Sequence, residues 1–345
     1  MRRPAVRLTL ACNNACVFCA QRGVDSGAVD VRAALAAARS EADEVMLTGG
    51  EPTLDVAVLV DAIAAARELG FCRVGVQTNG AHLDDPRLTA AGLTDAHVSL
   101  HGATAAVHDY HTGVRGSFDR LLAGVRAVRA RGVTVVATTV LTRSNFRVVG
   151  SLPWLLESRG IAGWNLAVPH AAGRAGEKLD RVVPRLGLAL PFALHTLQAA
   201  RKLGLPAWIT GAPLCALGPF AARALPGRER AYAEVCASCA VRPSCPGVDA
   251  AYLARFGGDE LSARAEAPAV DDDHPSLRAM FTGTGELGAR VDIAAVPESP
   301  GGARAKLPVI GRSKPAARET PRHGANKTGD ELREIFPDLF DRVKE

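Results

Sequence analysis

The chain has 345 residues, 48% of them hydrophobic, enough for one large domain with an appendage or for two domains. Its formal net charge of +5 is modest and no basic stripe is concentrated, so a dedicated nucleic-acid surface is not expected. No apolar run reaches the roughly 18 residues of a membrane span, and Arg7 interrupts the short apolar stretch near the start, so neither a span nor a signal peptide is expected.

Short apolar strands alternate with helices through about the first 210 residues. Strands are expected at 6–10, 44–47, 71–77, 96–100, 133–141, 163–168 and 206–210. Helices are expected at 30–39, after 52, at 86–91, 117–131, 148–159 and 191–203. Strands that are apolar throughout, rather than alternating, indicate a parallel sheet covered by helices. The sequence therefore predicts an α/β fold with at least six βα units.

Unusual residues follow the expected strand ends. A cysteine loop occupies 12–19, Gly-Gly-Glu-Pro occupies 49–52, Thr-Asn-Gly occupies 78–80, and Ser-Leu-His-Gly occupies 99–102. In βα barrels the active site lies at the carboxyl ends of the strands. These motifs are therefore expected to share one mouth.

The eight cysteines are clustered rather than spread along the chain. They are Cys12, Cys16, Cys19, Cys72, Cys215, Cys236, Cys239 and Cys245. Clustering without an export signal favours metal ligation in a reducing cytosol over a disulfide framework. A cytoplasmic location is therefore expected.

The first cluster of cysteines, Cys12-x3-Cys16-x2-Cys19, offers three thiolates to one face of an iron–sulfur cube. A [4Fe–4S] cluster normally takes four cysteines, so one iron is left open. A zinc knuckle or three unrelated buried thiols are the alternatives. Zinc sites usually pair C-x2-C with a second nearby pair. The spacing favours the cluster.

The three-cysteine loop together with Gly-Gly-Glu-Pro at 49–52 resembles the radical S-adenosylmethionine (radical SAM) superfamily, over about residues 4–210. The resemblance implies a partial (β/α)6 TIM-type barrel, with SAM chelated at the open iron of a [4Fe–4S] cluster. It implies reductive cleavage of SAM to a 5′-deoxyadenosyl radical, which abstracts hydrogen from a substrate. A reductant such as ferredoxin or flavodoxin is then an expected partner.

The resemblance also assigns residues around SAM. Gly49 and Gly50 lack a Cβ, so the backbone can approach the methionyl end of SAM closely. Glu51 is expected to fix the strand end and to accept from the SAM amino group, and Pro52 to rigidify the turn. Phe18 is expected near the adenine or packed over the cluster.

Four further polar residues are candidates near the mouth. Ser99 and Asn79 match positions that contact SAM, although hydrogen bonding at the strand ends explains them equally well. Arg174 is expected to pair with a carboxylate of SAM or substrate, or to lie on the surface. His101 is a candidate for proton transfer, against the alternative of a solvated loop histidine.

The second cluster of cysteines, Cys215, Cys236, Cys239 and Cys245, has the spacing C-x20-C-x2-C-x5-C. It resembles the auxiliary-cluster region of twitch- and SPASM-type radical SAM enzymes. No cysteine follows Cys245, so the resemblance implies one auxiliary [4Fe–4S] cluster. A structural zinc site with four thiolates is the alternative. Cys72 is expected to be a buried thiol.

These features predict four segments. Residues 1–210 form the radical SAM partial barrel, and 211–257 form the auxiliary cluster region. Residues 258–327 are expected to be a largely disordered linker. Residues 328–345 are expected to form a short terminal helix behind a capping box.

The function implied is modification of a peptide or protein by a radical SAM enzyme. The alternative is small-molecule or cofactor biosynthesis similar to the molybdenum-cofactor GTP cyclase, whose family usually carries three auxiliary cysteines and ends in Gly-Gly, whereas this chain has four and ends otherwise. A non-enzymatic iron–sulfur sensor or scaffold is a third reading. A sensor needs no open iron, so the three-cysteine loop argues against it.

Overall fold

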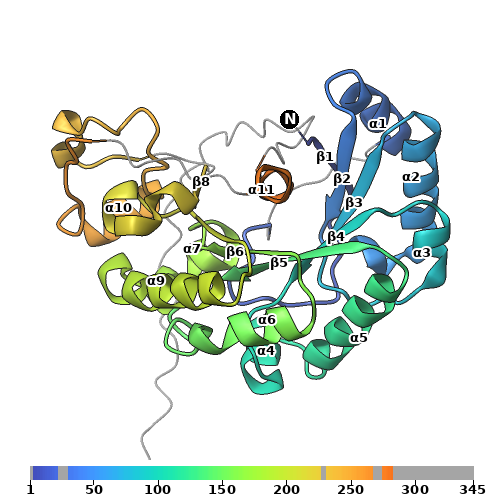
Figure 1. Ribbon diagram of the computed structural model, residues 1–345, viewed down its shortest axis with the longest axis horizontal. Helices are drawn as coiled ribbons and strands as arrows, with labels where there is room; N and C mark the ends of the chain where they lie inside the picture. The colour runs from blue at the N-terminus through green and yellow to red at the C-terminus, as the bar shows by residue number, and fades with distance from the viewer. Residues whose placement is uncertain (1–2, 22–29, 227–230, 267–273, 283–345) are drawn as a thin grey trace, which may run out of the picture. The chain divides into compact units, whose positions relative to one another are not determined.

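The fold is built on one parallel sheet whose strands neighbour each other in chain order (Figure 1). The computed structural model describes residues 3–21, 30–226, 231–266 and 274–282. The strands are β1 (Ala5–Thr9), β2 (Glu44–Gly49), β3 (Arg73–Thr78), β4 (Asp95–Ser99), β5 (Thr134–Val140), β6 (Gly163–Ala167), β7 (Ala207–Thr210) and β8 (Ala224–Leu225). Among these described strands, β1 and β8 do not pair with each other, so the barrel is open. The predicted α/β fold, a partial TIM-type barrel, is confirmed; β7 and β8 extend it beyond six strands.

Helices connect the strands, and the longer ones lie on the outer face of the curved sheet (Figure 1). The connecting helices are α1 (Val31–Arg39), α2 (Val56–Glu68), α3 (Pro86–Ala90), α4 (Ala105–Thr112), α5 (Ser117–Ala130), α6 (Leu152–Ser158), α7 (Gly173–Glu177), α8 (Leu179–Val182) and α9 (Leu186–Lys202). The short helices α4, α7 and α8 were not expected from the sequence. None of the helices that the structure describes combines the length and apolarity needed to cross a membrane.

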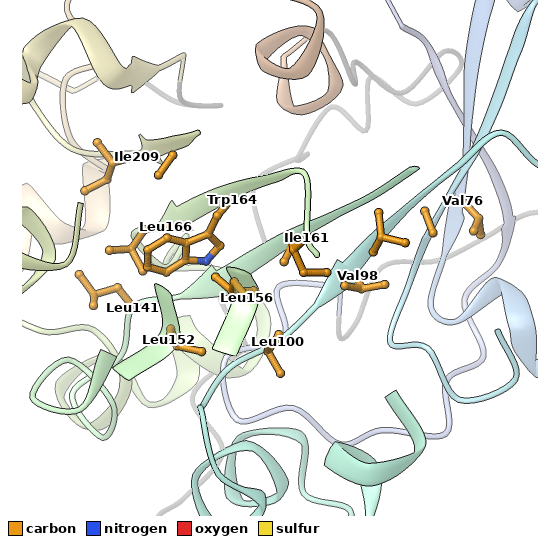
Figure 2. Packing of buried hydrophobic residues seen from close by; sticks show 14 of the residues in the cluster. Val76, Val98, Leu100, Leu141, Leu152, Leu156, Ile161, Trp164, Leu166 and Ile209 are labelled. Atoms are coloured by element: carbon orange, nitrogen blue, oxygen red, sulfur yellow. The ribbon is translucent and has the colours of Figure 1, made fainter. Parts of the chain in front are cut away.

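The core lies between the sheet and these helices. Figure 2 shows Trp164 of β6 beside Leu152 and Leu156 of α6, and all three are fully buried. The indole Nε1 of Trp164 donates to Thr139 Oγ1 of β5 at 3.0 Å, so its one polar atom is satisfied inside the core. Because these apolar strands are covered on both faces, the ends of the strands are where a functional site is expected.

The amino-terminal ends of the strands are closed by helix α11 (Pro275–Phe281), which lies on the inner side of the sheet in Figure 1. The ring of Phe281 packs 4.9 Å from His97 of β4 and 5.5 Å from Trp208 of β7. Met280 is buried. This helix lies within the stretch predicted as a linker.

A cysteine-rich region follows β7 and contains mostly short 3₁₀ turns, with helix α10 (Ala250–Phe256) after the last cysteine. Residues 258–266, also predicted as linker, contact it. The Arg264 amide donates to Cys239 Sγ at 3.3 Å and the Arg264 guanidinium donates to Leu214 O at 3.2 Å. The rest of the predicted linker and the predicted terminal helix 328–345 lie outside the described residues.

A buried ion pair ties β4 to the start of the chain. Arg3 Nη2 lies 2.6 Å from Asp95 Oδ1, both side chains are nearly inaccessible, and Thr94 Oγ1 donates to Asp95 Oδ2 at 2.8 Å. Replacing Asp95 by Ala leaves the buried Arg3 guanidinium without its nearest carboxylate, and only Glu44 Oε2 remains, at 3.9 Å from Arg3 Nε. We expect the free energy of unfolding, measured by urea denaturation, to fall by about 3–5 kcal/mol.

The control is Asp43→Ala, which breaks the exposed Arg39–Asp43 pair of 2.8 Å. It should cost less than about 1 kcal/mol. Equal losses for the two variants would contradict the assignment of Asp95 as a structural anchor.

Candidate active site

A cavity of about 380 Å³ opens at the carboxyl ends of the strands. The sequence-predicted residues that line it are Cys12, Cys16, Phe18, Cys19, Gly49, Gly50, Glu51, Asn79, Ser99 and His101. The opposite wall comes from later parts of the chain, residues 167–170, 210–211 and 246–249. Pro52 and Arg174 are not among the lining residues. The motifs therefore share one mouth.

Gly49 and Gly50 bring the end of β2 against the end of β1. A Cβ on Gly49 would lie 2.3 Å from Thr9 O, and a Cβ on Gly50 would lie 2.3 Å from both Leu10 O and Ala11 O. The Gly50 amide donates to Thr9 O at 2.7 Å. The close approach that requires glycine is thus made to the chain leading into the cysteine loop, a contact the sequence analysis missed.

The Glu51 carboxylate joins the ends of β2 and β3. It is fully buried. Its Oε1 accepts from the Thr53 amide at 2.8 Å, from Thr53 Oγ1 at 2.6 Å and from Thr78 Oγ1 at 2.5 Å. Its Oε2 accepts from the Asn79 amide at 2.5 Å. A buried carboxylate with four donors is held rigidly.

Asn79 carries this order into the cysteine loop. Its Nδ2 donates to Asn13 Oδ1 at 2.7 Å and lies 3.9 Å from Cys12 Sγ. The Asn14 amide also donates to Cys12 Sγ, at 3.4 Å. Donors aimed at a sulfur are the environment of a ligating thiolate.

Two further elements hold the loop. The amides of Ala15 and Val17 donate to carbonyls at the end of α4, at 2.8 and 3.0 Å. On the other side, the Arg174 amide donates to Cys19 O at 2.9 Å and Arg174 Nη1 donates to Cys16 O at 3.2 Å. The structure therefore places Arg174 on the cysteine loop.

Two thiols of the loop, those of Cys16 and Cys12, resist ionisation on their own. Burial raises the pKa of Cys16 to about 12, with further contributions from the charges of Cys19 and Cys12. Burial also raises the pKa of Cys12. Three adjacent thiolates therefore need a cation among them, and iron bound by sulfur supplies that charge. The donor set fits an iron–sulfur group.

His101 lies at the base of the cavity, with its ring 4.5 Å from that of Phe18. Its Nδ1 accepts from the Val140 amide at 3.3 Å, which leaves the proton on Nε2. Burial, followed by the neighbouring His108 and His111, lowers the pKa of His101 well below its usual range. This environment favours a fixed Nε2–H donor over proton exchange at neutral pH.

A polar pair on the opposite wall escaped the sequence analysis. His170 Nδ1 lies 2.6 Å from Asp249 Oδ2, and the Ala171 amide donates to the same oxygen at 3.1 Å. Burial alone would raise the pKa of Asp249, but hydrogen bonds from His170, Ala171 and Ala251 outweigh it and lower the pKa to about 2. Asp249 therefore stays ionised at neutral pH.

The later four cysteines, Cys215, Cys236, Cys239 and Cys245, line one small cavity of about 10 Å³. The amides of Leu214 and Gly247 each donate to Cys245 Sγ at 3.4 Å. Among the described residues, no three or more His, Cys, Asp or Glu side chains are arranged to hold a single metal ion. The sequence-derived grouping of these four residues thus corresponds to one place in the fold.

Cys72 was expected to be a buried thiol, but it is exposed. It precedes β3, before the chain enters the sheet, and its Sγ contacts Asp43 O at 3.1 Å.

Comparison with known families identifies the part of the chain that carries the cysteine loop. Residues 6–146 match the family model named Radical SAM superfamily. These residues form a radical SAM domain. The domain includes the cysteine loop, Gly-Gly-Glu-Pro and His101, whereas the wall at 167–170, 210–211 and 246–249 comes from outside the matched range.

The chain is similar to curated relatives over part of its length. A Probable GTP 3′,8-cyclase of Saccharolobus islandicus is 32% identical over 177 residues, covering 49% of this chain and 57% of the relative. An AdoMet-dependent heme synthase of Methanosarcina barkeri is 30% identical over 215 residues, covering 59% and 60%. The chain thus spans a little over half the length of these relatives. Among solved structures, Streptococcus suis SuiB bound to precursor peptide SuiA aligns with a TM-score of 0.49 at 17% identity, covering 60% of this chain and 48% of that chain. Native anSMEcpe with bound AdoMet aligns with a TM-score of 0.45 at 15% identity, covering 60% and 63%.

Buried neutral histidines beside the cavity make stability depend on pH. Burial, opposed by Asp109 and reinforced by His111, lowers the pKa of His108 to about 4. The unfolded chain takes up this proton with a pKa near 6.5, so the stability is complete above about pH 6.5 and is lost as the pH falls toward 4. Between about pH 7.5 and pH 5.5 we expect His108 alone to remove about 1 kcal/mol.

The measurement is the urea unfolding free energy at several pH values. His108→Gln, which does not titrate and keeps an acceptor for the His101 amide, should show a shallower pH dependence. An unchanged slope in the variant would contradict a neutral, buried His108.

Proposed function

We propose that the chain is a radical SAM enzyme in which Cys12, Cys16 and Cys19 hold a [4Fe–4S] cluster and SAM occupies its open iron. The carrying observation is that the three cysteines and Gly49-Gly50-Glu51 line a single cavity at the strand ends. Once reduced by a partner such as ferredoxin or flavodoxin, a cluster held there would supply the reductive cleavage of SAM to a 5′-deoxyadenosyl radical for hydrogen abstraction from a substrate.

In this proposal the residues of the chain bind SAM and hold the cysteine loop in position. Glu51 and Asn79 fix the loop through the contacts described above. The backbone at Gly49 and Gly50 borders the methionyl part of SAM, and Ser99 and the Nε2–H of His101 offer hydrogen bonds to its nucleoside part. Phe18 covers the ligand on its apolar side, since its ring lines the cavity. Pro52 supports this wall from behind, in the turn after Glu51.

For the second cysteine set the proposal is an auxiliary [4Fe–4S] cluster held by Cys215, Cys236, Cys239 and Cys245. Two observations support a shared metal group here. All four cysteines line one cavity, and amide groups donate to Cys239 and Cys245.

The substrate proposed is a peptide or protein segment. Four-cysteine auxiliary regions of the twitch and SPASM type often accompany peptide maturation, and the cavity lies between the barrel and this region. Cofactor biosynthesis is the second candidate, favoured by the names of the relatives, a GTP cyclase and heme synthases. The ionised Asp249 on the far wall disfavours a triphosphate or a propionate there, because like charges repel. A screen of peptides and GTP, read by deuterium transfer from labelled substrate into 5′-deoxyadenosine, separates the two.

Replacing Cys16 by Ala should abolish SAM cleavage, because two thiolates do not hold the cluster that binds SAM. The measurement is 5′-deoxyadenosine formed after dithionite reduction of the reconstituted protein. Cys239→Ala is the matched control and should retain uncoupled cleavage. Cleavage by Cys16→Ala at the wild-type rate would overturn the proposed site, and a fully loaded wild-type protein that forms no 5′-deoxyadenosine would refute the activity.

Metal analysis tests the auxiliary site separately. Two [4Fe–4S] clusters correspond to about eight iron and about eight sulfide per chain. Cys239→Ala should lose about half of both. About four iron with one zinc per chain would instead assign the second site to zinc.

A further inference from the structure

Arg174 touches the cysteine loop at two points. Its amide donates to Cys19 O at 2.9 Å, and its guanidinium donates to Cys16 O at 3.2 Å, across 158 residues of chain. The loop segment between these two carbonyls carries Phe18 and ends in a thiol that lines the cavity. One residue from the segment after β6 thus holds two of the three cysteines, Cys19 through its backbone amide and Cys16 through its side chain.

The residue before it makes this contact possible. Gly173 begins α7 with a φ of +52°, and a Cβ there would lie 2.5 Å from Cys19 O. A left-handed backbone and a close approach both require glycine. The start of α7 is therefore shaped to lie directly against the loop.

The charge of Arg174 lies against the cysteine loop. Its Nη1 is 3.2 Å from the carbonyl oxygen of Cys16, a residue that lines the cavity. Guanidinium does not lose its proton in proteins, so this positive charge is permanent. It lies half-buried, where solvent screens it less than at an exposed site.

We infer that Arg174 is a positioning residue that clamps the cysteine loop and raises the reduction potential of the cluster bound there. This inference rests on the proposed function. Reduction of a cluster adds negative charge, and a fixed positive charge nearby stabilises the reduced form. The role differs from pairing with a carboxylate of SAM, because the guanidinium already donates to Cys16 O and Arg174 is outside the cavity lining.

The experiment uses the full chain reconstituted with iron and sulfide, as wild type and as Arg174→Lys, Arg174→Gln and Arg174→Met. The readouts are iron content, the midpoint potential of the cysteine-loop cluster followed by EPR without SAM, and the Kd for SAM. Arg181→Gln, an exposed arginine on α8, is the matched control. We expect a lower potential in Arg174→Gln and Arg174→Met, little change in Arg174→Lys, and none in the control.

Three results overturn the inference. Potentials that equal wild type in Arg174→Gln and Arg174→Met remove the electrostatic role. A shift in Arg174→Lys as large as in Arg174→Met shows that charge is not its cause. A tenfold weaker affinity for SAM in Arg174→Gln, at an unchanged reduction potential, shows that Arg174 binds SAM instead. If Arg174→Met loses its iron, the Lys and Gln variants decide by the same measurements. A wild-type protein without an EPR-active reducible cluster is a failure of the proposed function itself.

Discussion

The close contact between the ends of β1, β2 and β3 is the constraint on which the site depends. The cysteine loop has no regular secondary structure, so its order must be imposed from outside. Two glycines let β2 reach the backbone at Thr9–Ala11, and the buried carboxylate of Glu51 fastens β3 to the same point. From there Asn79 reaches Asn13 inside the loop. A motif read as a SAM-binding turn is therefore also the joint that fixes the thiols.

Different electrostatics distinguish the two walls of the cavity. On the wall with the cysteine loop, burial raises the pKa of Cys12 and Cys16 and lowers that of His101, so these groups favour their uncharged forms in the absence of a cation. On the far wall, hydrogen bonds keep Asp249 ionised beside His170. In the proposed function, the sulfonium of SAM and the iron of a cluster would bring positive charge to this wall, where the thiols need it. The far wall therefore presents the carboxylate of Asp249 and the imidazole of His170 to a ligand in the cavity.

Local patterns predicted most of the barrel, because apolar strands, caps and glycine stops act within a few residues. The strand-end motifs belong to this class, and so does the start of α2, where the Asp55 side chain accepts from the Val58 amide. Helix α4 was missed because its histidines and small residues form no apolar stripe, although Thr104 caps it. The cysteines and Gly-Gly-Glu-Pro were recognisable for the same local reason, since their spacing is short.

Contacts between distant parts of the chain could not be predicted. No spacing rule connects His170 with Asp249, or Arg174 with Cys16, because the fold alone brings them together. Helix α11 is a similar case: its seven residues look like part of a linker, and only Phe281 against Trp208 shows where they pack. Cys72 was wrongly expected to be buried, because a position at the start of a strand does not reveal whether the side chain faces solvent.

Gly247 lines both cavities, and the residues around it form part of the far wall. The larger cavity therefore has two sides that come from different stretches of the chain. The side with the cysteine loop lies within residues 6–146, and the side facing it consists of residues 167–170, 210–211 and 246–249. Substitutions on the facing side can therefore change what the cavity admits while the thiols stay as they are. An engineer who wants a new substrate should vary residues 167–170 and 246–249 and leave the cysteine loop and its supports untouched.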